Sequence, residues 1–142
     1  MKFLFVHADY VSYEVKQKSK VAEEIDDAHR KGRMENPLIV FLSVEERDEN
    51  SEKNAKPVDR ALGEIKDIAS KIKVKNVALF PFAHLSESLA SPDYAISVLK
   101  ELETELEKSE FNLLRVPFGW YKEFEFRSKG HPLSVLSRAV RS

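Results

Sequence analysis

Short apolar runs alternate with amphipathic stretches along this chain. An uninterrupted apolar run that is rich in β-branched and aromatic side chains is typical of a strand covered on both faces. Runs of this kind predict strands at Phe3–Val6, Leu38–Leu42 and Val77–Phe80, and Phe111–Val116 is expected to be the next strand. The segment Val11–Val15 is expected to pair with the first run as a hairpin across residues 8–10.

Helical spacing is clear in two long segments. The first begins at Pro57 and carries Val58, Leu62, Ile65, Ala69 and Ile72 on one face. The second begins at Ser91-Pro92-Asp93, which supplies a hydroxyl cap, a proline at the first helical position and a carboxylate at the positive end of the dipole. Its apolar stripe consists of Ala95, Leu99, Leu102 and Leu106.

The remaining segments have weaker patterns. Leu133, Leu136 and Val140 share one helical face and predict a last helix. Residues 16–32 are mostly charged and predict a surface excursion that holds one helix. Residues 45–56 lack apolar anchors and predict a mobile loop.

These elements predict an α+β fold in which a mixed β-sheet layer is packed by helices. A length of 142 residues favours a single domain spanning residues 1–142. Two apolar helices are enough to cover one face of the sheet. Because the strands read as buried on both faces, a second subunit is expected to cover the other, which predicts a homodimer.

Composition narrows the possible functions. The formal net charge of -1 argues against a protein that grips nucleic acid through a broad basic surface, but it permits a site that reads only the end of an RNA. The chain has no cysteine and its four histidines lack ligand spacing, so we expect neither a metal site nor a cofactor. It also lacks a membrane-spanning run and a signal peptide, which predicts a cytoplasmic protein without a membrane partner.

The segment Pro117–Arg127 contains the most informative lysine. With the period of a strand, Lys122 falls on the same face as Phe124 and Phe126, while Glu123 and its alternate neighbours face the other way. A charge on an apolar face is costly unless it is paired or reaches a polar cavity. Lys122 therefore indicates a pocket wall, and the alternative is a lysine at a strand end whose ammonium reaches water.

A second stretch, Pro81–Ser86, has a similar construction. A buried strand ends in a Pro-aromatic turn and is followed by His84, close to where sheets with parallel strands place ligands. His84 is therefore a candidate functional residue. The alternative is a structural histidine that is held by hydrogen bonds.

Several motifs in fixed order resemble one known family. They are Pro81-Phe82-Ala83-His84-Leu85-Ser86, Pro117-Phe118-Gly119-Trp120-Tyr121-Lys122 and Lys129-Gly130-His131-Pro132-Leu133, together with His7-Ala8-Asp9-Tyr10 and Gly32-Arg33-Met34-Glu35. The whole chain resembles the amino-terminal editing domain of archaeal threonyl-tRNA synthetase. The resemblance implies a D-aminoacyl-tRNA deacylase-like fold, a homodimer and hydrolysis of serine from mischarged tRNA(Thr).

The resemblance also implies roles for particular residues. Catalytic roles fall to His84, Lys122 and Tyr121, with Lys122 contacting the seryl group. The flanking motif residues are expected to bind the substrate: Pro81, Phe82, Ala83, Phe118, Gly119 and Trp120. Val44, Glu45 and Glu46 are expected near the terminal adenosine of the tRNA, whose aminoacylated 3′ end is the expected partner.

One position departs from the family pattern. Some relatives have a carboxylate in the last helix where this chain has Val135, so we expect no carboxylate base there, and assistance by the ribose hydroxyl is favoured. The alternatives are a stand-alone D-aminoacyl-tRNA deacylase and a non-catalytic module that binds the tRNA end or dimerises. The length also leaves no room for the other synthetase domains, which predicts either an excised fragment or a separately encoded editing factor.

Overall fold

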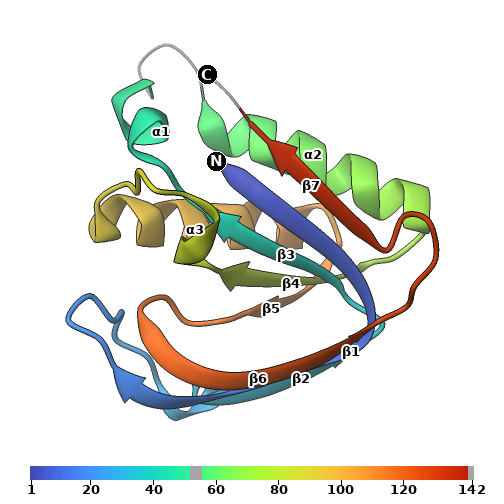
Figure 1. The fold of residues 1–142 in the computed structure, drawn as a ribbon, viewed down its shortest axis with the longest axis horizontal. Coiled ribbons are helices and arrows are strands. Elements are labelled where there is room, and N and C mark those ends of the chain that lie inside the picture. The colour runs from blue at the N-terminus through green and yellow to red at the C-terminus, as the bar shows by residue number, and fades with distance from the viewer. Residues whose placement is uncertain (52–55, 141–142) are drawn as a thin grey trace.

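The fold is arranged around one long strand, β1 (Lys2–Lys18), in a computed structural model that describes residues 1–51 and 56–140. Figure 1 shows β1 curving from the N-terminus, beside β3, down to a lower layer that it forms with β2 and β6. Its first half pairs with β3 (Leu38–Ser43) and β7 (Val135–Ala139). Its second half pairs with β2 (Lys31–Glu35) and β6 (Trp120–Ser128).

The predicted hairpin at residues 8–10 is wrong, because β1 runs through this stretch without a turn. The register against β6 shifts between Ala8 and Val11, so the strand bends at a bulge instead of reversing. A tight hairpin also favours residues with positive φ, and none of residues 8–10 adopts one. Both halves of β1 are paired on both edges, which stabilises the continuous strand.

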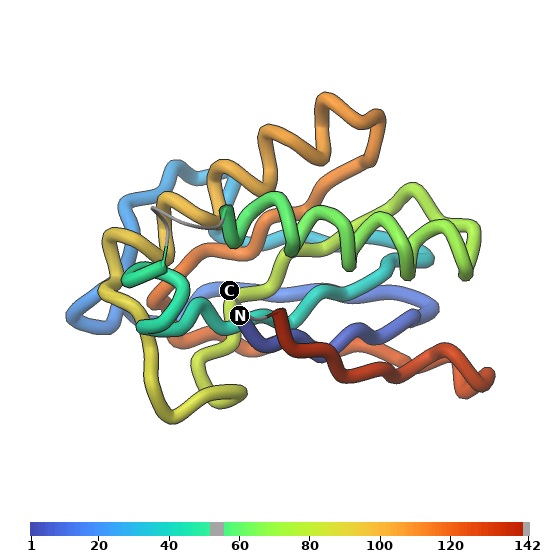
Figure 2. The backbone as a smooth tube through the Cα atoms, turned by 90° about the horizontal axis from the view of Figure 1, so that it is seen from above, coloured from blue at the N-terminus to red at the C-terminus, as the bar shows by residue number. Residues whose placement is uncertain are grey.

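A parallel sheet extends from β3 through β4 (Asn76–Pro81) to β5 (Asn112–Arg115). The crossovers between these strands contain α2 (Pro57–Ile72) and α3 (Pro92–Lys108). These elements confirm the strands and both long helices predicted from the apolar pattern. Seen from above in Figure 2, α2 and α3 lie side by side, and their apolar faces join β1, β3 and β4 in one core cluster.

The second face of this sheet is covered by the same chain. Along β3, Val40 and Leu42 pack in the cluster with the helices, whereas Ile39 and Phe41 pack in a second cluster with Val11 and other residues of the curled β1–β6 layer. The sequence-based reason for a second subunit, an uncovered sheet face, is therefore wrong. A bent strand provides the cover that was assigned to a partner.

The predicted loop at residues 45–56 begins with a short helix, α1 (Glu46–Ser51), and its residues 52–55 lie outside the described residues. The Asp48 carboxylate is 1 % exposed; it accepts hydrogen bonds from the Glu45 amide at 2.7 Å and from the Met1 ammonium at 2.8 Å. The first contact caps the helix, and the second anchors it to residues far away in sequence. Because both contacts are polar, the spacing of apolar residues in the sequence could not predict this helix.

The predicted last helix is wrong, because residues 135–139 form strand β7. The first half of β1 has a free edge on the side away from β3, and β7 pairs along it from Val6–Val135 to Lys2–Ala139. Pairing with this edge outweighs the helical spacing of Leu133, Leu136 and Val140.

The charged excursion at residues 16–32 also differs from the prediction. It contains the end of β1, the short 3-10 helix η1 (Asp27–His29) and the beginning of β2, and no α-helix. Across the described residues the fold is α+β with a mixed sheet, as the sequence predicted.

Candidate functional site

A pocket of about 510 Å³ opens at the carboxyl ends of β3 and β4. The short 3-10 helix η2 (Ala83–Leu85) follows β4 and forms one side, and the start of α3 forms the floor. The turn before β6 and the first residues of β6 form the opposite wall. Open sheets with parallel strands place ligands at such carboxyl ends, so the fold provides a natural binding position here.

The structure brings together most of the residues that the sequence singled out. Ten of the predicted site residues line the pocket: Val44, Pro81, Phe82, Ala83, His84, Phe118, Gly119, Trp120, Tyr121 and Lys122. They come from the residue after β3, the end of β4 and the residue after it, η2, the turn before β6 and β6 itself. Glu45 and Glu46 do not line the pocket.

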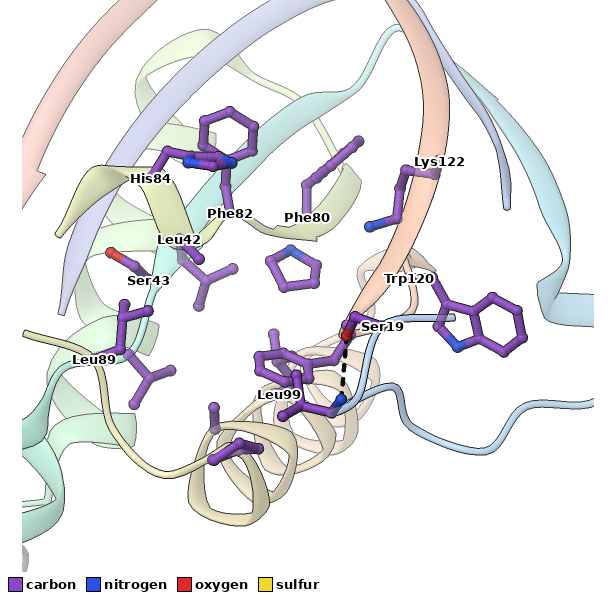
Figure 3. Close-up of a pocket in the computed structure, with 18 of the residues that line it drawn as sticks. Ser19, Leu42, Ser43, Phe80, Phe82, His84, Leu89, Leu99, Trp120 and Lys122 are labelled. Carbon is purple, nitrogen blue, oxygen red and sulfur yellow. Dashed lines mark hydrogen bonds between the residues drawn. The ribbon is translucent and has the colours of Figure 1, made fainter. Parts of the chain in front are cut away.

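Lys122 extends from β6 into the pocket (Figure 3). It pairs with buried Val15 of β1, so it lies on the inner face of the lower layer as its spacing predicted. Its Nζ lies 5.5 Å from the centre of the Phe80 ring, and no described carboxylate forms an ion pair with it. Burial lowers the pKa of Lys122 from its ordinary value of 10.5 to about 8, with the charge of Glu23 acting in the opposite direction.

His84 and Tyr121 lie at the rim. The His84 side chain is exposed on η2, and its ring packs edge-on against Phe82 with 5.2 Å between ring centres. Tyr121 is 64 % exposed because it alternates with Lys122 along β6. Both side chains can therefore reach a ligand that extends out of the pocket, whereas Lys122 faces a ligand inside it.

Glu45 is engaged within the protein. Its carboxylate accepts a hydrogen bond from Ser86 at 2.7 Å and lies 3.5 Å from the Met1 ammonium. Burial acts to raise the pKa of Glu45, but Ser86, the Met1 ammonium and the charge of Lys2 together lower it. The exposed Glu46 uses its amide to donate to the Ser88 carbonyl, so both residues stabilise the loop that follows η2.

Sequence reasoning missed part of the lining. Six such residues are Ser19, Val21, Ser43, Leu89, Ala95 and Leu99. Ser43 is 3 % exposed, and its Oγ has no hydrogen-bond partner among the described residues. The periodicity of α3 marked Ala95 and Leu99 as core positions, which they also are, but no sequence signal marked the others.

The turn before β6 has a conformation that explains its glycine. Gly119 has a φ of +78°, which favours glycine, and a Cβ there would lie 2.7 Å from the Val21 carbonyl oxygen. Segment 19–23 therefore packs directly against this turn. Figure 3 shows the hydrogen bond of 3.0 Å from the Ser19 amide to the Gly119 carbonyl that joins the two.

The described residues hold neither a cluster of metal ligands nor a membrane-spanning helix. Within residues 1–51 and 56–140, no three His, Asp or Glu side chains are grouped so as to hold a metal ion. None of the described helices combines the length and apolar character needed to cross a membrane.

Comparison with known proteins identifies the family. Residues 1–140 match the family described as the archaea-specific editing domain of threonyl-tRNA synthetase. The chain belongs to this family. It is 48 % identical over 141 residues to a threonine–tRNA ligase of Methanococcoides burtonii and 49 % identical over 141 residues to one of Thermococcus onnurineus. Each alignment covers 99 % of this chain and 22 % of the relative, so the chain spans about a fifth of the length of these ligases.

The fold of the editing domain is also found in a solved structure. The protein named c-Myc DNA Unwinding Element Binding Protein superposes with a TM-score of 0.72 over the full length of both chains, with 12 % sequence identity. At this identity the likeness concerns the fold alone. The predicted α+β fold with a mixed sheet is confirmed.

Val135, the position at which the family resemblance implied a carboxylate in some relatives, lies on β7 and not on the predicted last helix. It pairs with Val6 and is 53 % exposed, and it does not line the pocket. No carboxylate is therefore available at this position to orient a water molecule or a histidine.

The burial of Lys122 predicts a pH-dependent effect on stability. Because the pKa is lowered on folding, the unfolded chain binds more protons between about pH 8 and 10.5, and Lys122 destabilises the fold most below pH 8. Lys122→Met should therefore raise the free energy of unfolding at pH 7, and this gain should shrink as the pH rises toward 10.5. Urea unfolding at several pH values measures both effects.

The matched control for this prediction is Lys100→Met, which changes an exposed lysine on α3. We expect this substitution to change the unfolding free energy by less than about 0.5 kcal/mol. A Lys122→Met variant that is less stable than wild type at pH 7 would contradict the burial argument.

Proposed function

We propose that this domain hydrolyses the ester of seryl-tRNA(Thr), the product of a mischarging error. One observation carries the proposal: the half-buried Lys122 lines the pocket, and its ammonium forms no ion pair with a carboxylate among the described residues. A buried cation without a counterion favours a ligand that brings polar groups to it. The seryl group offers a hydroxyl and a carbonyl oxygen, and the editing-domain family gives this chemistry its context.

The need for such a site follows from the size of the error. Serine lacks one methyl group of threonine, and a pocket discriminates a single methylene by only about 1–3 kcal/mol. A second site that accepts the smaller side chain increases accuracy. We propose that the apolar walls at Phe80 and Leu99 limit the space beside Lys122, so that seryl esters enter and threonyl esters are disfavoured.

The proposed reaction is an ester hydrolysis. Water attacks the carbonyl carbon, the bond from that carbon to the ribose 3′ oxygen breaks, and the water proton is transferred to that oxygen. We propose that the neighbouring ribose 2′-hydroxyl assists the water, that Lys122 holds the seryl group and that His84 and Tyr121 position the tRNA end. The proposed step uses no cofactor, and we expect it to take place in the cytoplasm.

The proposed contact with adenosine involves the chain that follows β3. Val44 lines the pocket, so it is suited to contact the terminal nucleoside directly. Glu45 and Glu46 are expected to act by supporting the loop beside it, because their polar groups contact Ser86 and Ser88.

The primary test is deacylation of matched esters. The domain should hydrolyse L-seryl-tRNA(Thr) at least about 10-fold faster than L-threonyl-tRNA(Thr), which is the range that one methyl group provides. Lys122→Met should lower seryl-tRNA hydrolysis by about 10- to 100-fold, because a hydrogen bond to a charged group contributes about 1.5–3 kcal/mol. Rates from a single-turnover assay give both comparisons.

Lys100→Met serves again as the control and should retain wild-type rates. D-tyrosyl-tRNA is the substrate that distinguishes a D-aminoacyl-tRNA deacylase, and faster hydrolysis of it than of the seryl ester would replace the proposed substrate. If Lys122→Met hydrolyses both esters as fast as the wild type, Lys122 has no role in the reaction. If the wild type hydrolyses none of these esters, the non-catalytic module is favoured.

The source of the base can be tested separately. A general base contributes about 100-fold or more, so His84→Ala should lose that much if the imidazole takes the proton from water. We expect a loss of less than about 10-fold, because no described carboxylate orients His84 and the ribose hydroxyl is proposed to assist. A tRNA that ends in 2′-deoxyadenosine should then be almost inert, and normal cleavage of this substrate would return His84 to the role of base.

We also propose that the domain forms a homodimer through the open side of an aromatic cluster. Phe124 and Phe126 pack on Phe80 and Phe41 but remain 40 % and 37 % exposed. A second copy is the expected cover, since the family resemblance implies a dimer. Light scattering at micromolar concentration should give twice the chain mass, and Phe126→Lys should give the monomer; a monomeric wild type would refute the proposal.

A further inference from the structure

Glu23 connects the segment after β1 to the turn that forms one wall of the pocket. Its amide donates to the Phe118 carbonyl at 3.0 Å, and its carboxylate accepts from the Phe118 amide at 2.8 Å. Its carbonyl accepts from the Trp120 indole Nε1 at 2.9 Å. Glu23 thus binds the turn through its amide, its carbonyl and its side chain. Lys122 lies on β6, two residues after Trp120.

The same carboxylate forms a buried ion pair. Arg115 donates to both Glu23 oxygens and also donates through Nε to Glu103 at 3.1 Å. Glu23 and Arg115 are 6 % and 8 % exposed. Burying two charges costs desolvation energy, and apolar replacements are often as stable, so stability alone is a weak reason for this pair.

The geometry offers a different reason. The backbone of Gly119 packs so tightly against segment 19–23 that a Cβ would not fit between them. A small shift of this segment therefore also moves the turn. Ser19 and Val21 of the same segment line the pocket, as do Phe118 and Trp120 of the turn. Holding the two backbones together therefore fixes one wall and the starting point of the strand that carries Lys122.

We infer that Glu23 is a positioning residue for the reaction, which holds the turn 117–120 by its contacts with Phe118 and Trp120 and thereby places the Lys122 ammonium against the substrate. This inference rests on the proposed function for its activity test. Sequence reasoning gave no sign of it, because Glu23 lies in a charged run and Arg115 is 92 residues away.

Electrostatics adds to the positioning. Glu23 is the charged group whose effect on Lys122 opposes that of burial. The other charged or titratable groups around this wall include Arg115, Glu103 and Tyr13 beside Glu23, Lys18 and Arg30 over the Trp120 ring, Glu24 paired with Lys18, and His84 across the pocket. Without the Glu23 charge, the negative charge that favours protonated Lys122 is lost and less negative charge balances Arg115. The pKa of Lys122 should therefore fall.

The test is the pH profile of Glu23→Gln in the seryl-tRNA assay. Arg115 Nη1 and the Phe118 amide both donate to one Glu23 oxygen, Oε1, and Arg115 Nη2 donates to the other. Glutamine places an NH2 donor against one of these donors, so kcat should fall about 10-fold with KM changed less than about 3-fold. We expect the wild-type rate to decline above about pH 8, where Lys122 loses its proton, and this decline should move to lower pH in Glu23→Gln. A wild-type kcat with an unmoved profile would overturn the inference.

Glu103→Gln is the matched control, because it removes the other carboxylate on Arg115 without touching the turn. It should keep kcat within about 2-fold and leave the alkaline limb in place. An equal loss in both variants would mean that the charge of the network matters and not the hold on the turn, which would also overturn the inference.

A second variant covers the case in which Glu23→Gln does not fold. Glu23→Met with Arg115→Met removes both buried charges and keeps similar volumes, so the fold should persist, but the Phe118 amide has no carboxylate to donate to. This folded double variant should show the reduced kcat. Wild-type kcat there, or loss of the fold in both variants, would assign the pair to folding alone.

A measurement without substrate separates this inference from the proposed function. The amide shift of Phe118 and the titration of the Lys122 side chain, both followed by NMR, should change in Glu23→Gln and not in Glu103→Gln. If these signals move while no ester is hydrolysed by the wild type, the proposed function fails and the hold on the turn stands. If the signals stay in place, the inference fails whatever the activity.

Discussion

The pairing of both halves of β1 with strands on each edge is the constraint on which the rest of the structure depends. Its first half joins β3 and β7, and its second half joins β2 and β6 after the bulge near Ala8. Because one strand belongs to both layers, the bend brings the lower layer over the second face of the parallel sheet. The pocket lies where the two layers separate, at the carboxyl ends of β3 and β4.

This arrangement explains why a lysine can be held in an apolar wall. Backbone pairing with Val15 of β1 directs the Lys122 side chain to the inner face of the layer. The energetic cost of burying this charge appears as a lowered pKa of Lys122. Groups with shifted pKa values are common at binding sites, where a ligand can supply the missing polar contacts. Glu23 and Arg115 lie behind the same wall, where a buried pair can hold a turn that has no regular structure of its own.

The sequence by itself determined the apolar elements and the motifs. The runs at β3 and β4 and the stripes of α2 and α3 identify their own secondary structure, because burial requires those periods. The alternation in Lys122, Phe124 and Phe126 placed the lysine on the inner face, and ten of the twelve predicted site residues line the pocket. Motifs in fixed order also indicated the family that the comparisons established.

Only the tertiary structure decided the features that depend on distant partners. Leu133, Leu136 and Val140 have helical spacing, but residues 135–139 form a strand because β1 offers a free edge. Ala8 lies at a bulge because both halves of β1 pair with other strands. Asp48 caps α1 while it is paired with Met1, and Glu23 holds the turn at Phe118. No local sequence pattern predicts either contact. Hydrogen bonds and ion pairs across tens of residues have no sequence period, so they appear only once the chain is folded.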